Sequence, residues 1–278
     1  MNLLELIQAA LIEDLPRGDI TTESLALRPQ PGRALLKAKE DIVLSGALPF
    51  EQTMVAVEPN VKVKWHFDEG DQILKGQNIC TLEGDLIPIL KAERVALNFL
   101  GHLSGIATLA SKFVAKVKSG NPNCQTKILD TRKTLPGLRV LQKKAVVHGG
   151  GFNHRLNLSD AVLLKDNHIS VMGGLKPAVE RVRAHTKLPV EVEARNLEEV
   201  RVAVALGVHR ILLDNMSNDL LKEALTLIPA TIESEASGNM TLDRVADVAR
   251  LGVNYISVGA LTHSAPVADV SLLFEWES

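Results

Sequence analysis

The sequence predicts an α/β protein that combines a mixed α/β segment with an incomplete, open barrel of parallel strands. From residue 127 onward, short apolar segments alternate with helical segments, and this alternation is typical of a parallel sheet covered by helices. Glu193, Asp214 and Glu235 each end an apolar segment at a spacing of 21 residues, which indicates repeated strand–helix units. Six strands are clear in this region, so we expect an open barrel and not a closed one of eight strands.

Residues 1–110 are predicted to form a first domain with both helices and strands. Met1–Leu15 has the apolar spacing of an amphipathic helix. Two short strands, Val61–Phe67 and Asn78–Leu82, are each followed by a cluster of turn residues. We assign residues 111–278 to the barrel domain, with the option that the extreme C-terminus returns to the first domain.

The barrel domain is predicted to contain six strands and four helices. The strands comprise residues 128–130, 161–164, 190–193, 211–213, 232–235 and 255–258, and the helices comprise residues 175–185, 197–206, 220–227 and 242–251. We expect Glu193, Asp214 and Glu235 to lie at equivalent heights at the carboxyl ends of their strands, where α/β barrels carry their active sites. A second interpretation is that each acid caps the helix that follows it.

Composition and charge argue against several classes of protein. The net charge of -2 and the 3% of aromatic residues disfavour a nucleic-acid partner, because a basic surface and stacking platforms are both missing. No segment approaches the roughly 18 apolar residues of a membrane span, and the N-terminus lacks the pattern of a signal peptide. Cys80 and Cys124 have no metal-ligand spacing, so we expect free thiols. These observations predict a cytoplasmic protein with no membrane partner.

Residues 132–165 form a basic window in an otherwise acidic chain. The window contains one acid, Asp160, and seven basic residues, which are Arg132, Lys133, Arg139, Lys143, Lys144, Arg155 and Lys165. Guanidinium and ammonium groups suit a multiply charged small anion, and Gly149–Gly151 would let such a ligand approach the backbone. The alternative is a solvated basic face without a ligand.

The motifs of this window resemble those of the quinolinate phosphoribosyltransferase family. They occupy residues 130–134, 136–139, 149–155 and 165–168. Further motifs of the same family follow its order at residues 13–14, 18–22, 93–94, 98–100, 103–108, 191–193, 213–216, 235–238 and 257–264. The resemblance therefore covers the chain nearly end to end.

Four residues depart from the family pattern: Lys144, Val147, Asn157 and Arg195. Val147 and Asn157 flank the glycine-rich turn, so this turn is where the shape is expected to differ from the family pattern. A related branch, the pyrophosphorylase-like protein of molybdenum-transport operons, shares the fold. It ranks second because its known sequences lack the Lys-Asp-Asn-His element found here at residues 165–168.

The resemblance implies a transferase of NAD biosynthesis. Such an enzyme joins quinolinate to phosphoribosyl pyrophosphate and yields nicotinate mononucleotide, pyrophosphate and carbon dioxide. It also implies an α/β sandwich domain before the open barrel, and a homodimer or larger oligomer in which the N-terminal domain of one subunit covers the barrel mouth of its partner. Arg94 would then act on quinolinate bound to the partner subunit.

The family pattern assigns the quinolinate carboxylates to four cations, which are Arg94, Arg132, Arg155 and Lys165. Fork-shaped guanidinium groups fit carboxylates well. His154 would either bond the ligand or have a structural role. Lys133 would meet a phosphate group as a point charge, and we count it with Lys165 among the catalytic candidates.

Glu193 and Asp214 are the candidates for stabilising the positive charge that builds on the ribose as pyrophosphate leaves. They would act through the ribose hydroxyls and a magnesium ion, which prefers one or two carboxylates plus substrate phosphates. The 5-phosphate is expected against the glycine-containing turns after the last two strands. Those turns contribute Ser237, Gly238, Asn239, Val258, Gly259 and Ala260, with His263 just beyond them.

Two other functions fit part of the pattern. Lys165 could form a Schiff base, as in barrel aldolases, if neighbouring cations favoured its neutral form. A non-catalytic anion sensor would explain the basic window, but it would have no use for carboxylates opposite that window. Borohydride trapping and a pyrophosphate-release assay separate these functions from the transferase.

Overall fold

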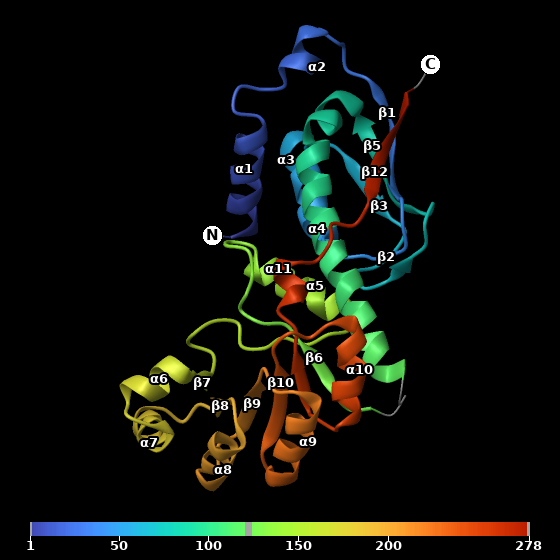
Figure 1. The fold of residues 1–278 in the computed structure, drawn as a ribbon. Coiled ribbons are helices and arrows are strands. Elements are labelled where there is room, and N and C mark those ends of the chain that lie inside the picture. Colours follow the sequence, from blue (N-terminus) through green and yellow to red (C-terminus); the bar gives the residue numbers. More distant parts are fainter. Residues whose placement is uncertain (1, 120–123, 277–278) are drawn as a thin grey trace. The chain divides into compact units, whose positions relative to one another are not determined.

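The computed structural model describes residues 2–119 and 124–276, which form two compact units. The first unit comprises the described residues within 1–111, 135–150 and 264–278. The second unit comprises those within 112–134 and 151–263. Each unit contains its own main sheet, as the ribbon shows (Figure 1).

The main sheet of the first unit has four antiparallel strands in the order β12-β1-β5-β3. They are β1 (Pro31–Ala38), β3 (Lys62–Trp65), β5 (Asn78–Asp85) and β12 (Val270–Trp276), while β2 (Ile42–Val43) pairs separately with β4 (Gln72–Ile73). Strands β3 and β5 correspond to the two short strands predicted here. Because β12 pairs with β1 along its length, the C-terminal strand belongs to the first unit.

Helices pack on this sheet to form an α/β sandwich. The helices of the unit are α1 (Leu3–Asp14), α2 (Ile20–Ser24), α3 (Ala47–Val57), α4 (Leu86–Ser119), whose last residues belong to the second unit, and α5 (Arg139–His148). Phe50 of α3 and Leu100 of α4 share a fully buried core with Leu36 of β1 and Leu82 of β5. The alternating burial along β1 explains this arrangement, since Ala34, Leu36 and Ala38 all point to the same face.

Helix α5 departs from the predicted domain division, which placed residues 135–150 in the barrel domain. Leu138 and Leu141 pack against Ile7 of α1 and Phe99 of α4. Gln142 is fully buried, and its Nε2 lies 2.8 Å from Nε2 of His102 in α4. These contacts join two segments distant in sequence, so a boundary drawn from the pattern of consecutive elements could not reveal them.

The glycine-rich turn also differs from its prediction. A Cβ atom at Gly149 would lie 2.3 Å from the backbone oxygen of Ala107 in α4, and Gly150 has a φ of 81°. These two glycines therefore serve close helix packing and a left-handed turn in the first unit. Neither is among the residues that line the cavity described below.

The second unit contains six parallel strands in the order β6-β11-β10-β9-β8-β7. They are β6 (Lys127–Leu129), β7 (Val162–Leu164), β8 (Val190–Ala194), β9 (Arg210–Asp214), β10 (Glu233–Ser237) and β11 (Tyr255–Ser257). No pairing joins β6 to β7 among the described residues. The predicted open α/β barrel of six strands is thus confirmed.

Six helices accompany these strands. They are α6 (Asp166–Val171), α7 (Leu175–His185), α8 (Leu197–Ala205), α9 (Asn218–Leu227), α10 (Leu242–Arg250) and α11 (Ala260–His263). The four predicted helices correspond to α7, α8, α9 and α10. Their N-caps are not the predicted acids, because Asn196, Ser217 and Thr241 cap α8, α9 and α10 with their own side chains.

The free edge of β6 is partly covered by the segment that follows the glycine-rich turn. Phe152 donates its backbone N–H to Ile128, and Asp130 donates its own to Phe152, at 2.8 and 3.1 Å. This pairing continues only briefly, as an isolated bridge between Leu129 and Phe152. It brings His154 to the carboxyl end of β6, where its backbone N–H donates to the Asp130 carboxylate at 2.9 Å.

The register of the sheet corrects the predicted positions of the three acids. Glu193 and Glu235 both pair with Leu212, so they lie at the same height. Asp214 pairs with Ser237 and lies two residues nearer the carboxyl end of the sheet. The equal spacing in sequence hides this difference, because the connection between β8 and β9 is shorter than the connection between β9 and β10.

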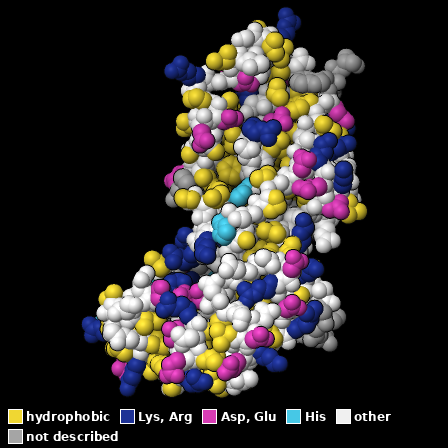
Figure 2. Space-filling view, viewed as in Figure 1, with side chains coloured by type: hydrophobic (Ala, Val, Ile, Leu, Met, Phe, Trp, Pro, Cys, Tyr) yellow, Lys and Arg dark blue, Asp and Glu magenta, His cyan; other side chains and the backbone are white. Residues whose placement is uncertain are grey.

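The remaining expectations from composition concern the surface and the thiols. Cys80 is buried and Cys124 is partly buried, and both are free. Acidic and basic side chains are interspersed over the face shown in Figure 2. None of the described helices, including α4 with its 34 residues, has the length and hydrophobicity needed to cross a membrane.

Candidate active site

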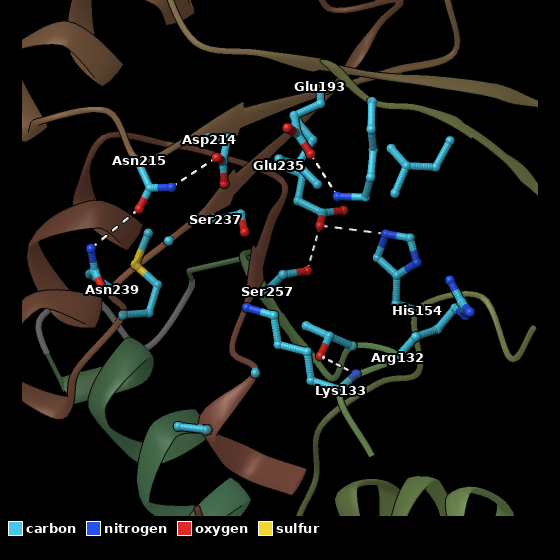
Figure 3. A pocket seen from close by; sticks show the side chains of 18 of the residues that line it. Arg132, Lys133, His154, Glu193, Asp214, Asn215, Glu235, Ser237, Asn239 and Ser257 are labelled. Atoms are coloured by element: carbon cyan, nitrogen blue, oxygen red, sulfur yellow. Dashed lines mark hydrogen bonds and ion pairs between the residues drawn. The ribbon is translucent and has the colours of Figure 1, made fainter. Parts of the chain in front are cut away.

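A cavity of about 890 Å³ opens at the carboxyl ends of the strands of the second unit. The predicted site residues that line it are Arg132, Lys133, His154, Arg155, Lys165, Glu193, Asp214, Ser237, Gly238, Asn239, Gly259, Ala260 and His263. Figure 3 shows Asp214 and Asn239 across the cavity from Arg132 and His154. Two predicted residues, Arg94 and Val258, are not among the lining residues.

Arg132, Lys133 and Arg155 form the basic side of the cavity. Arg155 donates from Nη1 to the backbone oxygen of Ala161 at 2.8 Å, which holds its guanidinium in place. Burial and the positive charge of Arg132 lower the pKa of Arg155. Among the described residues, no group accepts a hydrogen bond from the buried Nε of Arg132. Two close guanidinium groups and an unsatisfied donor suit an anionic ligand with several oxygens.

Lys165, which directly follows β7, forms an ion pair with Glu193 of the neighbouring strand β8. The Nζ atom of Lys165 lies 2.6 Å from Oε2 of Glu193, and their side chains are 46% and 11% exposed. A Schiff-base lysine attacks a carbonyl with its amino nitrogen. In this structure that nitrogen is occupied by Glu193, so the pairing disfavours that mechanism.

Asp214 ends β9 and is oriented by the residue after it. Asn215 donates from Nδ2 to Oδ2 of Asp214 at 2.8 Å, and Asn239 donates to Oδ1 of Asn215 at 3.3 Å. Asn215 and Asn239 have φ values of 55° and 50°, a left-handed conformation that asparagine tolerates better than most residues. The two asparagines therefore connect the turn after β9 to the turn after β10.

The turn after β10 brings bare backbone to the cavity wall. Gly238 has a φ of 94°, and a Cβ atom there would lie 2.2 Å from Oδ1 of Asn215. Arg244 of α10 supports both turns, since it donates to the backbone oxygens of Gly238 and Met216 at 3.0 and 2.5 Å. Helix α10 begins just after this turn and directs its N-terminus to the same side.

Gly259, after β11, makes room for Lys133. A Cβ atom at Gly259 would lie 3.1 Å from Cδ of Lys133 and 3.2 Å from Nε2 of His263. Thr262 donates to the backbone oxygen of Lys133 at 2.8 Å. Val258 was predicted to meet the phosphate, but its side chain is buried and its backbone N–H donates to Leu129 at 2.9 Å. At β11 the cavity is therefore lined by Ser257 and Gly259, and Val258 between them is not a lining residue.

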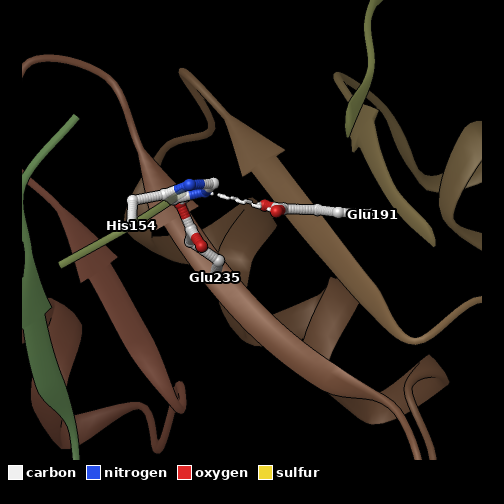
Figure 4. A group of neighbouring side chains, drawn as sticks. All are labelled: His154, Glu191 and Glu235. Carbon is white, nitrogen blue, oxygen red and sulfur yellow. Dashed lines mark hydrogen bonds and ion pairs between the residues drawn. The ribbon is translucent and has the colours of Figure 1, made fainter. Parts of the chain in front are cut away.

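His154 lies beside Glu191 and Glu235. From the sequence alone, Glu191 is not assigned to the site, and Glu235 is noted only as an acid at a strand end. The Nε2 atom of His154 is 3.2 Å from Oε2 of Glu191 and 3.5 Å from Oε1 of Glu235 (Figure 4). The side chain of His154 is 9% exposed, and those of Glu191 and Glu235 are 8% and 0% exposed. Burial lowers the pKa of His154, but the two carboxylates raise it more.

Arg210 compensates the charge of Glu235. Its Nη1 lies 3.1 Å from Oε2 of Glu235, its Nη2 lies 2.8 Å from Glu233, and its guanidinium stacks on Tyr255 at 3.9 Å. Ser257 donates to the other oxygen of Glu235. Burial, together with the charge of Glu191, raises the pKa of Glu235 to about 7.

The alternation of side chains along a strand could have indicated that Glu191 faces the site. Glu191 precedes Glu193 by two positions, so both side chains of β8 point into the barrel. Arg210 pairs with both Glu191 and Glu233 in the sheet, which places three charged residues in one layer. Pattern analysis detected the acids at strand ends, but only the register shows that the layer beneath them is also charged.

Two groups of acidic residues could be considered for a metal ion. Glu193 and Asp214 both line the cavity, and they fit a magnesium ion that receives its other ligands from substrate phosphates. His154, Glu191 and Glu235 offer ligand atoms within 4.8 Å of one another. Glu235 already binds Arg210 and Ser257 through both oxygens, so this second group is better described as a set of buried ion pairs and hydrogen bonds.

Models of two protein domains match the sequence. The C-terminal domain of quinolinate phosphoribosyl transferase matches residues 106–273, and the N-terminal domain matches residues 19–104. This chain belongs to the quinolinate phosphoribosyltransferase family. The resemblance inferred from the motifs is thereby confirmed over nearly the whole chain.

Relatives within the family align with nearly the whole of this chain. The chain is 40% identical to quinolinate phosphoribosyltransferase [decarboxylating] 2, mitochondrial, of Nicotiana glauca, over 99% of this chain and 83% of that protein. It is 38% identical to the probable nicotinate-nucleotide pyrophosphorylase [carboxylating] of Bacillus subtilis, over 98% of this chain and 93% of that protein.

Solved structures of the family share the fold. Nicotinate-nucleotide pyrophosphorylase from Ehrlichia chaffeensis superposes with a TM-score of 0.94 at 37% identity, over 99% of both chains. The enzyme from Francisella tularensis gives a TM-score of 0.93 at 35% identity, over 98% of this chain and 96% of that one. The names of these relatives favour the phosphoribosyltransferase over the molybdenum-operon branch.

Residues that depart from the quinolinate phosphoribosyltransferase pattern lie outside the cavity. Arg195 forms ion pairs with Asp166 of α6 and Glu199 of α8, at 3.6 and 3.9 Å. Asn157 accepts the backbone N–H of Ser159 at 2.8 Å and so stabilises a turn. Lys144 and Val147 are exposed on α5. None of these four residues is at a position that lines the cavity.

Proposed function

We propose that this protein transfers the phosphoribosyl group of phosphoribosyl pyrophosphate to quinolinate, with loss of carbon dioxide, in the cavity of the second unit. The observation that carries this proposal is the division of the cavity wall. Arg132 and His154 lie on one side, while Asp214 and Asn239, in the turns after β9 and β10, lie across from them. One side suits a dicarboxylate and the other suits a sugar phosphate.

Quinolinate binding is assigned to Arg132, Arg155 and Lys165. Two carboxylates on an aromatic ring need at least two fork-shaped donors, and the two arginines provide them. A carboxylate oxygen would also supply the acceptor that the buried Nε of Arg132 lacks. Lys165 would add a third positive charge from β7, with its position set by Glu193.

The 5-phosphate of the sugar is assigned to Ser237, Gly238, Asn239, Gly259 and Ala260. Gly238 and Gly259 have no side chain to block the approach of a phosphate to the backbone, and α10 contributes the positive end of its dipole. Lys133 and His263 lie beside Gly259 and would add donors for phosphate oxygens.

Glu193 and Asp214 are assigned to the ribose. The pyridine nitrogen of quinolinate attacks C1 of the ribose while the bond to pyrophosphate breaks, so positive charge develops on the sugar. Carboxylates held in position beside that carbon stabilise the charge. A magnesium ion bound with the substrate would neutralise charge on the pyrophosphate as it leaves. The bond between C2 and its carboxylate then breaks and carbon dioxide departs. The adjacent quaternary nitrogen stabilises the electron pair left on C2, and C2 takes up a proton from solvent.

Substrate choice tests the proposed function. We expect formation of nicotinate mononucleotide and pyrophosphate from quinolinate, with nicotinate rejected by at least about 100-fold in kcat/KM, because one carboxylate would leave cations of the site without a partner once the bound ligand excludes water. Product and carbon dioxide are measured together. Comparable turnover of nicotinate would contradict the assignment of Arg132, Arg155 and Lys165 to two carboxylates.

Assembly and location extend the proposal. We infer at least a homodimer in which Arg94 completes the quinolinate site of the partner subunit. This arrangement comes from the family resemblance and from the position of Arg94 on α4 in the first unit, outside the set of cavity-lining residues. A cytoplasmic location stays a prediction, since plant relatives are named for mitochondria or chloroplasts. Cell fractionation measures it directly.

A further inference from the structure

The buried ionic cluster lies next to the cavity, which His154 and Glu235 both line. We define the cluster as Glu191, Arg210 and Glu235, which lie on the consecutive strands β8, β9 and β10. Glu191 and Glu235 are both buried and face the same ring nitrogen of His154. An Nε2 atom without a proton would be a hydrogen-bond acceptor facing carboxylate oxygens, which are acceptors too. Nε2 must therefore carry a proton to bond with either glutamate.

The other ring nitrogen of His154 is used by Arg155. The backbone N–H of Arg155 donates to Nδ1 of His154 at 2.7 Å. A nitrogen that accepts a hydrogen bond carries no proton, so Nδ1 is deprotonated in this arrangement. The carboxylates require a donor at Nε2, so the ring proton lies there. The two contacts together select the neutral form of the ring with its proton on Nε2.

The two kinds of contact have opposite effects on the charge of the His154 ring. Glu191 and Glu235 favour a second proton on His154, while the Arg155 N–H excludes one, because a protonated Nδ1 cannot accept. The positive charge of Arg210 next to Glu235 reduces the need for a charged ring. The Arg155 contact, at 2.7 Å, decides in favour of the neutral form.

We propose that Glu191 and Glu235 are positioning residues that hold His154 with its proton on Nε2, so that Nδ1 fixes the backbone of Arg155 and hence its guanidinium in the quinolinate site. This inference rests on the proposed function and deepens it. His154 then acts on the ligand through Arg155 and not as a cationic contact. Arg155 is held at two points, its backbone N–H by His154 and its Nη1 by Ala161.

Steady-state kinetics with four variants test the proposal. We expect Glu191→Gln and Glu235→Gln to raise KM for quinolinate roughly 10-fold, with kcat and KM for phosphoribosyl pyrophosphate changed less than about 2-fold, since only Arg155 is displaced. His154→Asn retains an acceptor near the position of Nδ1, so it should keep quinolinate KM closer to wild type than His154→Ala. Glu180→Gln, on the exposed face of α7, is the control.

Two measurements separate this role from a merely structural one. In the His154→Asn background, Glu235→Gln should have no further effect on quinolinate KM, because its effect passes through Nε2 of His154. Nitrogen-15 NMR of the wild-type protein should show one protonated and one unprotonated nitrogen for His154. Thermal unfolding identifies any variant that fails to fold, and the NMR result stands without variants.

Three results would overturn the proposal. They are an imidazolium signal for His154 at the pH of the assay, equal losses in His154→Asn and His154→Ala, and unchanged quinolinate KM in both glutamate variants. The first two would indicate that the ring itself contacts quinolinate, and the third would show that the two glutamates do not position Arg155. Failure of the proposed function would appear differently, as a wild-type protein that forms no nicotinate mononucleotide.

Discussion

At the scale of the residue, the cavity depends on side chains and glycines whose positions are set by a few strong contacts. Asp214 is held by Asn215, Lys165 by Glu193, and Arg155 by Ala161. Such fixed groups lower the cost of reorganisation when charge develops during a reaction. Substitutions at these positions should therefore change turnover or substrate binding more than they change the fold.

Asp214→Asn and Glu193→Gln test the assignment to the transition state. Each change removes a negative charge but keeps the shape of the side chain, so we expect kcat to fall roughly 100-fold while KM for quinolinate changes less than about 3-fold. Initial rates with both substrates varied provide the two constants. Weak quinolinate binding with normal turnover would instead give these carboxylates a role in the ground state.

Gly238→Ala tests the approach of the backbone to the phosphate. The new Cβ would adopt a left-handed φ of 94° and collide with Asn215, so we expect KM for phosphoribosyl pyrophosphate to rise about 10-fold and stability to fall by about 1–2 kcal/mol. Gly252→Ala is the matched control, with a φ of 89° and nothing within 4 Å. It should lose similar stability without the change in KM. Equal KM values in the two variants would show that the close contact at Gly238 has no role in binding.

At the scale of the element, α5 shows how a short helix is assigned to a unit by polar contacts. Gln142 contacts His102 of α4 through its amide nitrogen and accepts the backbone N–H of Leu135 at 2.9 Å. The apolar residues beside it pack on α1 and α4. The helix carries three cations of the basic window, Arg139, Lys143 and Lys144, none of which lines the cavity.

The His102 contact predicts a pH dependence of stability. Burial lowers the pKa of His102, so the unfolded chain takes up the proton more readily than the folded one. Stability from this residue is present above its ordinary pKa of about 6.5 and is lost as the pH falls below that value. We expect the free energy of unfolding of His102→Asn to fall less between neutral and acidic pH than that of wild type.

Denaturant unfolding across this pH range measures the difference. His185→Asn, at an exposed position at the end of α7, is the control for loss of a histidine. If both variants lose the same stability as wild type on acidification, His102 does not contribute to the pH dependence.

At the scale of the whole molecule, the proposed dimer makes a prediction that a single chain cannot satisfy. Arg94 lies on α4 in the first unit, and Lys165 lines the cavity of the second unit. If Arg94 acts on the partner, a hybrid of Arg94→Ala and Lys165→Ala subunits has one site with both residues intact. Random exchange makes roughly half the dimers hybrid, so the mixture should recover about a quarter of wild-type activity.

Subunit exchange must be verified, for example with one chain labelled. A mixture that stays inactive after exchange would show that Arg94 acts within its own chain or has only a structural role. Activity in either parent variant alone sets the background for this comparison.

Strand and helix patterns determined most of the architecture without reference to the structure. All six parallel strands, four of their helices and the early strands β3 and β5 follow from local periodicity, because each strand or helix buries its own apolar face. The cavity-lining cations and carboxylates could also be predicted, because strand ends in a parallel sheet converge on one edge. The absence of Val258 from the cavity wall could not be predicted, since its position depends on a hydrogen bond to Leu129.

Only the tertiary structure decided the register of the sheet, the unit to which α5 belongs and the surroundings of His154. Each of these depends on contacts between residues distant in sequence, such as Glu191 with His154 or Gln142 with His102. Local sequence sets which residues can be buried and which are charged. The free energy of pairing those charges is set by their separation and their exclusion from water, and both quantities exist only after the strands have assembled.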